Sequence, residues 1–158
     1  MFNSIFKGFS FGLTSGIITT LGMIIGLNST SGSKLIVLGG VLSIAIADSF
    51  SDALGIHISE EADSSKSPKH VWMATLATFF SKLIFASTFI LPVLFLSLNT
   101  AVVVSCVYGL SLLSILSYYI AKSQNEKPLK VISEHLFIAL VVIVVTHLAG
   151  DLIAQYLG

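Results

Sequence analysis

The sequence contains no arginine and few charged residues of any kind. Only 10% of its 158 residues are charged, against about 25% in a typical soluble domain. Its eight lysines balance its eight acidic residues, and a neutral chain without a basic cluster excludes a nucleic-acid surface. Cys106 is the only cysteine, so no intrachain disulfide can form. The chain is 54% hydrophobic, which is too apolar for a soluble domain of this length, so lipid must cover much of its surface.

Long apolar runs alternate with short polar linkers along the whole chain. A helix that spans a bilayer needs about 20 mostly apolar residues, and several stretches meet this requirement. The first has no small-residue cleavage site, so we interpret it as a retained helix and not as a signal peptide. Pro92 is expected to kink or break the third. We predict an all-α, polytopic membrane protein with one domain, residues 1–158, and five transmembrane helices at about 5–27, 35–58, 71–98, 101–121 and 131–157.

The distribution of lysine predicts the orientation of these helices. Lysine-rich loops usually stay on the cytoplasmic side. An N-terminus inside puts Lys34 alone on the outside and six lysines on the cytoplasmic side, so we predict that arrangement, with the C-terminus outside. The expected location is the cell membrane, or a vacuolar-type membrane in a eukaryote. The six cytoplasmic lysines are Lys7, Lys66, Lys69, Lys122, Lys127 and Lys130.

Two aspartates, Asp48 and Asp52, lie inside the second predicted span. Residues four apart share one helix face, and each ionised Asp at a helix centre costs roughly 2.5–3.5 kcal/mol. Such a face must meet water, a cation or a proton. Hard divalent cations suit carboxylate oxygens, so the pair is a candidate metal site. The alternative is that one or both are protonated, or pair with a lysine, and join helices.

A second polar pair, His147 and Asp151, lies in the last predicted span at the same spacing. Imidazole and carboxylate together can bind a transition metal or relay a proton, because histidine titrates near neutral pH. The alternative is a hydrogen bond between His147 and Asp151 that fixes two helices.

Three further charged residues have two interpretations each. Lys82, in the centre of the third span, is either a counter-ion to Asp48, Asp52 or Asp151, or a competitor that a bound cation displaces. Glu60 and Glu61 end the second span, where they either collect metal cations at a cytoplasmic mouth or are ordinary solvated acids.

A glycine ladder of Gly8, Gly12 and Gly16 runs along the first span. Small residues every four positions let two helix backbones approach closely in lipid. The contact is either within one subunit or a dimer interface between two subunits, and we predict the dimer interface.

Five segments along the chain are similar, in order, to helices of one known family of membrane proteins. Phe11–Thr20 is similar to the first helix of that family, and Ser33–Gly40 with Ala47–Gly55 to its second helix. Ile90–Pro92 is similar to a third helix, and Val145–Gly150 to a last one. In this order, the segments resemble the vacuolar iron transporter family.

That resemblance implies a homodimer that exports ferrous iron or manganese from the cytoplasm, coupled to protons. Its ion path would follow the dimer interface, lined by the first two helices, with Ser15 and Thr19 adding hydroxyl oxygens. Ser15 stands where the family has an aspartate, Ile44 where it has an acid, and Asp52 where it has a methionine. The family's cytoplasmic metal-binding domain is reduced here to residues 60–69.

We therefore predict a transporter of a divalent metal cation, iron or manganese, that carries it out of the cytoplasm. The metal is the substrate, and no permanently bound cofactor is expected. The expected partners are a second copy of the chain and the lipid bilayer. One alternative is a proton-coupled transporter of another small solute, and another is a non-transporting scaffold subunit. An enzyme is not expected, because no nucleophile–base pair or phosphate loop appears.

Overall fold

The computed structural model describes residues 2–157, which fold into helices joined by short connections, with no strand in that range. Five helical segments are long and apolar enough to cross a membrane. The predicted all-α fold with five spans is therefore confirmed, and the protein is embedded in a membrane. The helices are α1 (Phe2–Ser31), α2 (Lys34–Glu61), α3 (Pro68–Thr88), α4 (Ile90–Phe95), α5 (Leu98–Ser123) and α6 (Pro128–Leu157).

The third span is broken into α3 and α4, as Pro92 predicts. Proline has no backbone N–H, and its ring clashes with the carbonyl four residues earlier, which here belongs to Thr88. Accordingly α3 ends at Thr88, and the backbone N–H of Phe89 donates to Ala86 O at 3.2 Å in a tighter turn. Together α3 and α4 form the single span Pro68–Phe95.

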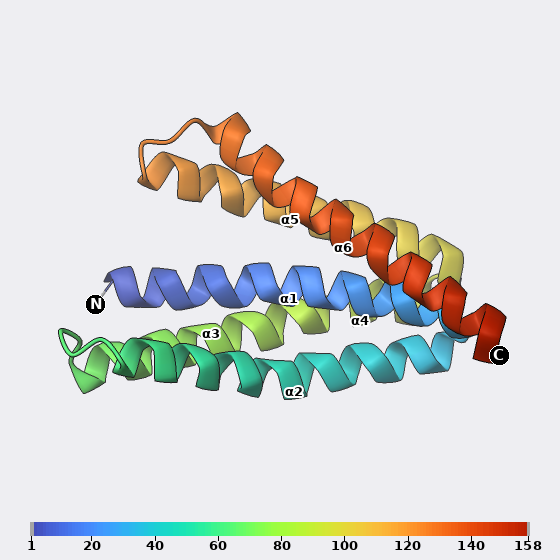
Figure 1. Ribbon diagram of the computed structural model, residues 1–158, viewed down its shortest axis with the longest axis horizontal. Coiled ribbons are helices and arrows are strands. Elements are labelled where there is room, and N and C mark those ends of the chain that lie inside the picture. The colour runs from blue at the N-terminus through green and yellow to red at the C-terminus, as the bar shows by residue number, and fades with distance from the viewer. Residues whose placement is uncertain (1, 158) are drawn as a thin grey trace.

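Helix α1 lies at the centre of the bundle and contacts α2, α3, α5 and α6 (Figure 1). Helices α2 and α3 pack on one side of it and the α5–α6 hairpin on the other. The α2–α3 and α5–α6 connections lie at the end of the bundle where α1 begins, and α6 ends at the opposite end. We call the first end the lysine-rich end, because Lys7, Lys66, Lys69, Lys122, Lys127 and Lys130 are all at or near it.

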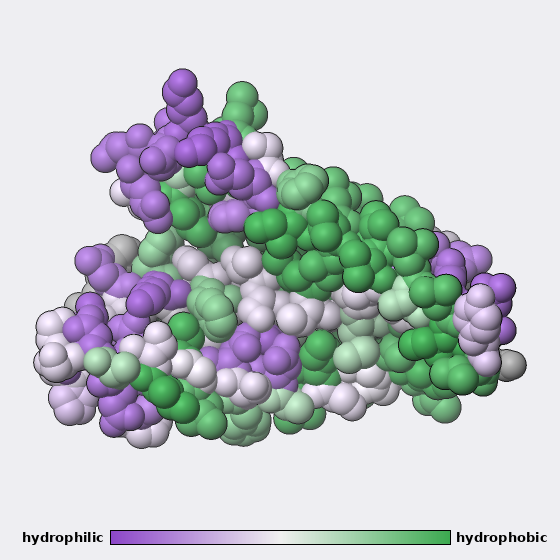
Figure 2. Space-filling view, in the orientation of Figure 1, coloured by the Kyte–Doolittle hydropathy of each residue, from purple (hydrophilic) through white to green (hydrophobic). Residues whose placement is uncertain are grey.

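The outer surface of the bundle is apolar along most of its length. Large side chains such as Leu42 and Phe50 on α2 and Phe137 and Leu148 on α6 are exposed. Hydrophilic residues gather at the two ends, and apolar residues cover much of the length between them (Figure 2). Soluble monomers rarely expose apolar patches of this extent, so this surface is the one that lipid covers.

The glycine ladder of α1 faces α3 of the same chain. A Cβ on Gly8 would strike the carbonyl oxygen of Ala74, and one on Gly12 would strike both Ser81 Oγ and the carbonyl oxygen of Thr78. The hydroxyl of Thr78 also donates to Gly8 O at 3.1 Å. Backbones that approach this closely leave no room for a second subunit. The predicted dimer interface at Gly8, Gly12 and Gly16 is therefore wrong, and the contact lies within one subunit.

Candidate cation site at mid-span

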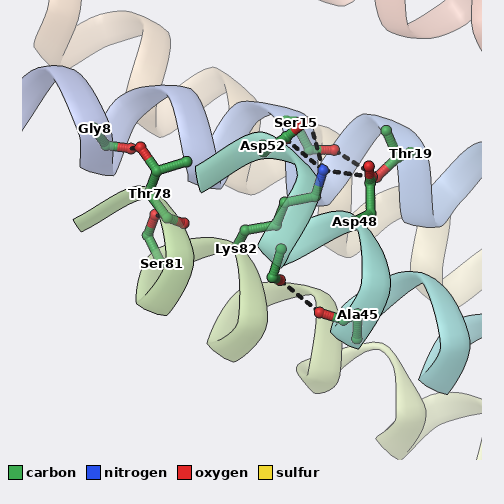
Figure 3. Close-up of polar contacts among 10 residues, drawn as sticks. Gly8, Ser15, Thr19, Ala45, Asp48, Asp52, Thr78, Ser81 and Lys82 are labelled. Carbon is green, nitrogen blue, oxygen red and sulfur yellow. Dashed lines mark hydrogen bonds and ion pairs between the residues drawn. The ribbon is translucent and has the colours of Figure 1, made fainter. Parts of the chain in front are cut away.

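The side chain of Lys82 joins three helices at the centre of the bundle. It extends from α3, and its Nζ contacts Asp48 Oδ2 and Asp52 Oδ2 on α2 (Figure 3). The same Nζ donates to Ser15 Oγ on α1 at 2.9 Å. The Lys82 side chain is fully buried, with 0% exposed. The structure thus places Lys82 as the counter-ion of both aspartates.

Small residues on the neighbouring helices surround this lysine. A Cβ on Gly16 would lie 3.4 Å from both Lys82 Cγ and Lys82 O, so this part of α1 packs directly against the lysine stem. On α2, Ser49 is buried, and its hydroxyl donates to the carbonyl of Ala45 in its own helix. The side chain of Ser49 therefore meets its hydrogen-bonding need locally and does not compete for the ammonium group.

Two carboxylates share one ammonium group at this point. When both carboxylates are ionised, one net negative charge remains near the middle of α2. No other basic side chain within residues 2–157 forms an ion pair with Asp48 or Asp52. An unbalanced charge at membrane depth is costly unless it faces water, an ion or protein. The site can therefore attract one further positive charge.

Asp48 opens onto a hollow between α1 and α2 of about 580 Å³. The side chain of Asp48 is 27% exposed. A hydrophilic patch is visible midway along this face of the molecule (Figure 2). The hydroxyl of Thr19 donates to Ser15 O at 2.8 Å, so its oxygen lone pairs remain free to accept. The hollow is lined by Thr19, Met23, Ser43, Ile44, Ala47, Asp48 and Ser51.

Met23, which the sequence alone indicates as a packing residue, is part of this lining. It is in the hollow because Ser15, Thr19 and Met23 are spaced four apart and share the face of α1 that looks toward α2. That spacing is visible in the sequence, but methionines on helices are usually packing residues. The sulfur of Met23 lies against α2 at Gly40, where an added Cβ would stand 3.3 Å from Met23 Sδ, about two helical turns from Asp48.

His147 and Asp151 form a separate pair on α6. His147 Nε2 lies 3.5 Å from Asp151 Oδ2, and His147 Nδ1 bonds the hydroxyl of Ser29 on α1. Both side chains are more than half exposed. Helix α6 packs on α1 and α5, whereas α2 packs on α1, α3 and α4. The structure therefore does not bring this pair together with Asp48 and Asp52.

The two glutamates at the end of α2 differ from each other. Glu60 is 3% exposed and forms an ion pair with Lys7 of α1, which links α1 to α2 at the lysine-rich end. Glu61 is exposed, and it lines a small hollow of about 110 Å³ with His57 and Lys66. Only Glu61 is placed to meet cations from solvent. The two therefore do not form a joint site.

The loop after α2 adds one further carboxylate to this end. The Ser65 hydroxyl and backbone N–H both donate to Asp63 Oδ1, at 2.6 and 3.0 Å. These hydrogen bonds lower the pKa of the Asp63 carboxyl below its usual value, so it is ionised at neutral pH.

No group of three or more His, Cys, Asp or Glu side chains suited to a metal occurs in the described part of the chain. A cation at Asp48 would therefore also need hydroxyl, thioether or water ligands. No family model matches the chain, and no curated protein matches it. Fold and site together define a class: a five-span α-helical membrane protein with a buried lysine–dicarboxylate group at mid-span.

Proposed function

We propose that the protein transports a divalent metal cation, with Fe²⁺ and Mn²⁺ as the first candidates, through the hollow beside Asp48. The observation that carries the proposal is the pair of carboxylates that share one lysine at mid-span, because one of them, Asp48, opens onto that hollow. A sealed scaffold would gain nothing from an unbalanced charge at this depth. The resemblance to the vacuolar iron transporter family supports the same function.

The lining of the hollow supports a transition metal over magnesium or calcium. Carboxylate and hydroxyl oxygens suit hard cations, whereas a thioether selects softer ones. Asp48, Thr19, Ser43 and Ser51 supply the oxygens, and Met23 supplies the sulfur. The oxygen groups suit Mn²⁺ and the thioether favours the softer Fe²⁺, and few strong ligands let a passing ion leave again.

The proposed direction is export from the cytoplasm. The lysine-rich end would be cytoplasmic, because lysine-rich loops stay inside. Glu61 would meet ions at that end, and His147 with Asp151 would form a second ligand pair or a proton relay on the way out. Proton coupling follows the family resemblance, and the cell membrane is the proposed location.

The protein would work as a homodimer whose interface lies on α2. Gly39, Ser43, Ala47, Ser51 and Gly55 recur every four residues and are all exposed. A Cβ on Gly39 or Gly55 would meet nothing within 4 Å in the chain itself. A row of small residues supports close packing of helices in lipid, and a second copy on this face would shield Asp48 from lipid.

Flux of Mn²⁺ into proteoliposomes tests the proposal directly. Asp48→Asn should lower the initial rate by at least about tenfold, because it removes the accessible carboxylate. Asp63→Asn makes the same chemical change in the α2–α3 loop and should leave the rate unchanged. Equal rates for the wild type and Asp48→Asn would refute the central claim. Thermal stabilisation by another solute, with none by Mn²⁺ or Fe²⁺, would favour a different substrate.

A further inference from the structure

Asp48 and Asp52 are not equivalent, although both contact Lys82. Asp48 lines the hollow and is 27% exposed, whereas Asp52 is 18% exposed and is not part of that lining. A cation that enters through the hollow therefore reaches Asp48 first. Asp52 lies one turn away on the same face of α2, with Lys82 Nζ between the two carboxylates (Figure 3).

Lys82 sits where it opposes such a cation. Its ammonium group shares the carboxylate of Asp48, so an arriving cation meets a like charge a few ångströms away. In a low-dielectric interior this repulsion is much stronger than in water. The ammonium has two other partners, Asp52 Oδ2 and Ser15 Oγ at 2.9 Å, which it can keep when it leaves Asp48.

We propose that Asp52 acts as the holding partner of Lys82, which lets the lysine release Asp48 to the substrate cation. In this arrangement Asp48 binds the cation, and Asp52 never touches it. Asp52 and Lys82 are positioning residues that set the charge of the site. This inference rests on the proposed function, because it assigns roles within the same cation site.

The charge balance gives this proposal a distinctive consequence. With Asp52 neutral, Lys82 has only one carboxylate left, Asp48, and the pair has no net charge. The site then no longer attracts a cation electrostatically, so binding weakens although no ligand has been removed. If Lys82 is made neutral as well, Asp48 regains its single free negative charge. A second substitution should therefore restore what the first one removes.

Binding of Mn²⁺ to the purified full-length protein in lipid nanodiscs tests this, read from the free-Mn²⁺ signal in electron paramagnetic resonance. Asp52→Asn should weaken binding by at least about tenfold, which corresponds to about 1.4 kcal/mol. The double variant Asp52→Asn/Lys82→Met should return to within about threefold of the wild type. Asp52→Glu keeps the charge and should also bind within about threefold. Thermal unfolding of each variant confirms that it is folded.

The possible outcomes separate this inference from the proposed function. If Asp48→Asn abolishes binding while Asp52→Asn binds like the wild type, the positioning role is wrong and the proposed function stands. If the double variant binds as weakly as Asp52→Asn alone, Asp52 is itself a ligand and the inference fails. If the wild type and Asp48→Asn bind Mn²⁺ equally, the proposed function fails and the inference with it. Should Asp52→Asn not fold, loss of binding in the folded double variant still overturns the inference.

Discussion

Gly16 on α1 lies directly against the stem of Lys82 on α3: a Cβ at the glycine would stand 3.4 Å from Lys82 Cγ. This contact links the glycine ladder, which brings α1 and α3 together, to the charged group at mid-span. The lysine extends from this contact to Asp48 and Asp52 on α2. The packing of α1 on α3 and the candidate cation site are therefore adjacent in the bundle.

The close approach of α1 and α3 should be sensitive to a single methyl group. In Gly12→Ala the added Cβ would strike Ser81 Oγ and the carbonyl of Thr78. Since the clash includes backbone, the helices must move apart, and we expect a loss of about 1–3 kcal/mol. Thermal unfolding in detergent should show a lower midpoint. Gly26→Ala on the same helix is the control, because a Cβ there would lie 3.5 Å from Thr146 O, an ordinary van der Waals contact. Equal midpoints for the two variants would contradict the packing described.

The proposed dimer face on α2 can be tested by cysteine cross-linking in membranes. In a Cys106→Ser background, Ser51→Cys should form a disulfide between two subunits under mild oxidation, because the interface brings the two copies of this row of small residues together. A band at twice the monomer mass on a non-reducing gel would report it. Leu148→Cys on the exposed face of α6 is the matched control and should not cross-link. A dimer band from Leu148→Cys alone would place the interface on α6 instead.

Met23 should influence which metals the protein prefers. Replacing its thioether with the apolar side chain in Met23→Leu removes the only sulfur in the lining of the hollow. We expect Fe²⁺ and Co²⁺ binding to weaken several-fold, by about 1 kcal/mol, with little change for Mg²⁺, because sulfur ligands favour the softer ions. Isothermal titration calorimetry measures both. Met73→Leu makes the same change on α3 outside the hollow and should leave both affinities as they are. Parallel losses for all metals would mean that Met23 only packs.

The ion pair of Lys7 and Glu60 should stabilise the bundle and not collect metal. Lys7→Met leaves a carboxylate that is 3% exposed without its partner. A buried charge without a partner is destabilising, and the exposed position of Lys7 moderates the loss to about 1–3 kcal/mol. A lower unfolding midpoint with unchanged Mn²⁺ affinity is the expected result. The control is Lys66→Met, whose partner Asp63 is exposed. If Lys7→Met strengthened Mn²⁺ binding without loss of stability, Glu60 would be a collecting group after all.

The features that depend on local sequence were predicted correctly. Five spans follow from the length of the apolar runs, because the bilayer requires a helix of that length whatever its neighbours are. The break before Pro92 follows from the chemistry of one residue. The mid-span position of Asp48 and Asp52 follows from their place in the second run. None of these depends on which helix lies beside which.

The tertiary structure alone decided which faces of the helices meet. The sequence pattern of Gly8, Gly12 and Gly16 is compatible with packing on α3 or on a second subunit. Small residues permit close packing without specifying the partner. Likewise, the sequence left three aspartates as candidates for Lys82, and only the order of helices around α1 brought it to Asp48 and Asp52. Met23 became a candidate ligand only because α1 and α2 pack so that it lines the same open hollow as Asp48. Contacts between distant segments depend on how all the helices pack at once, and one-dimensional spacing does not contain that information.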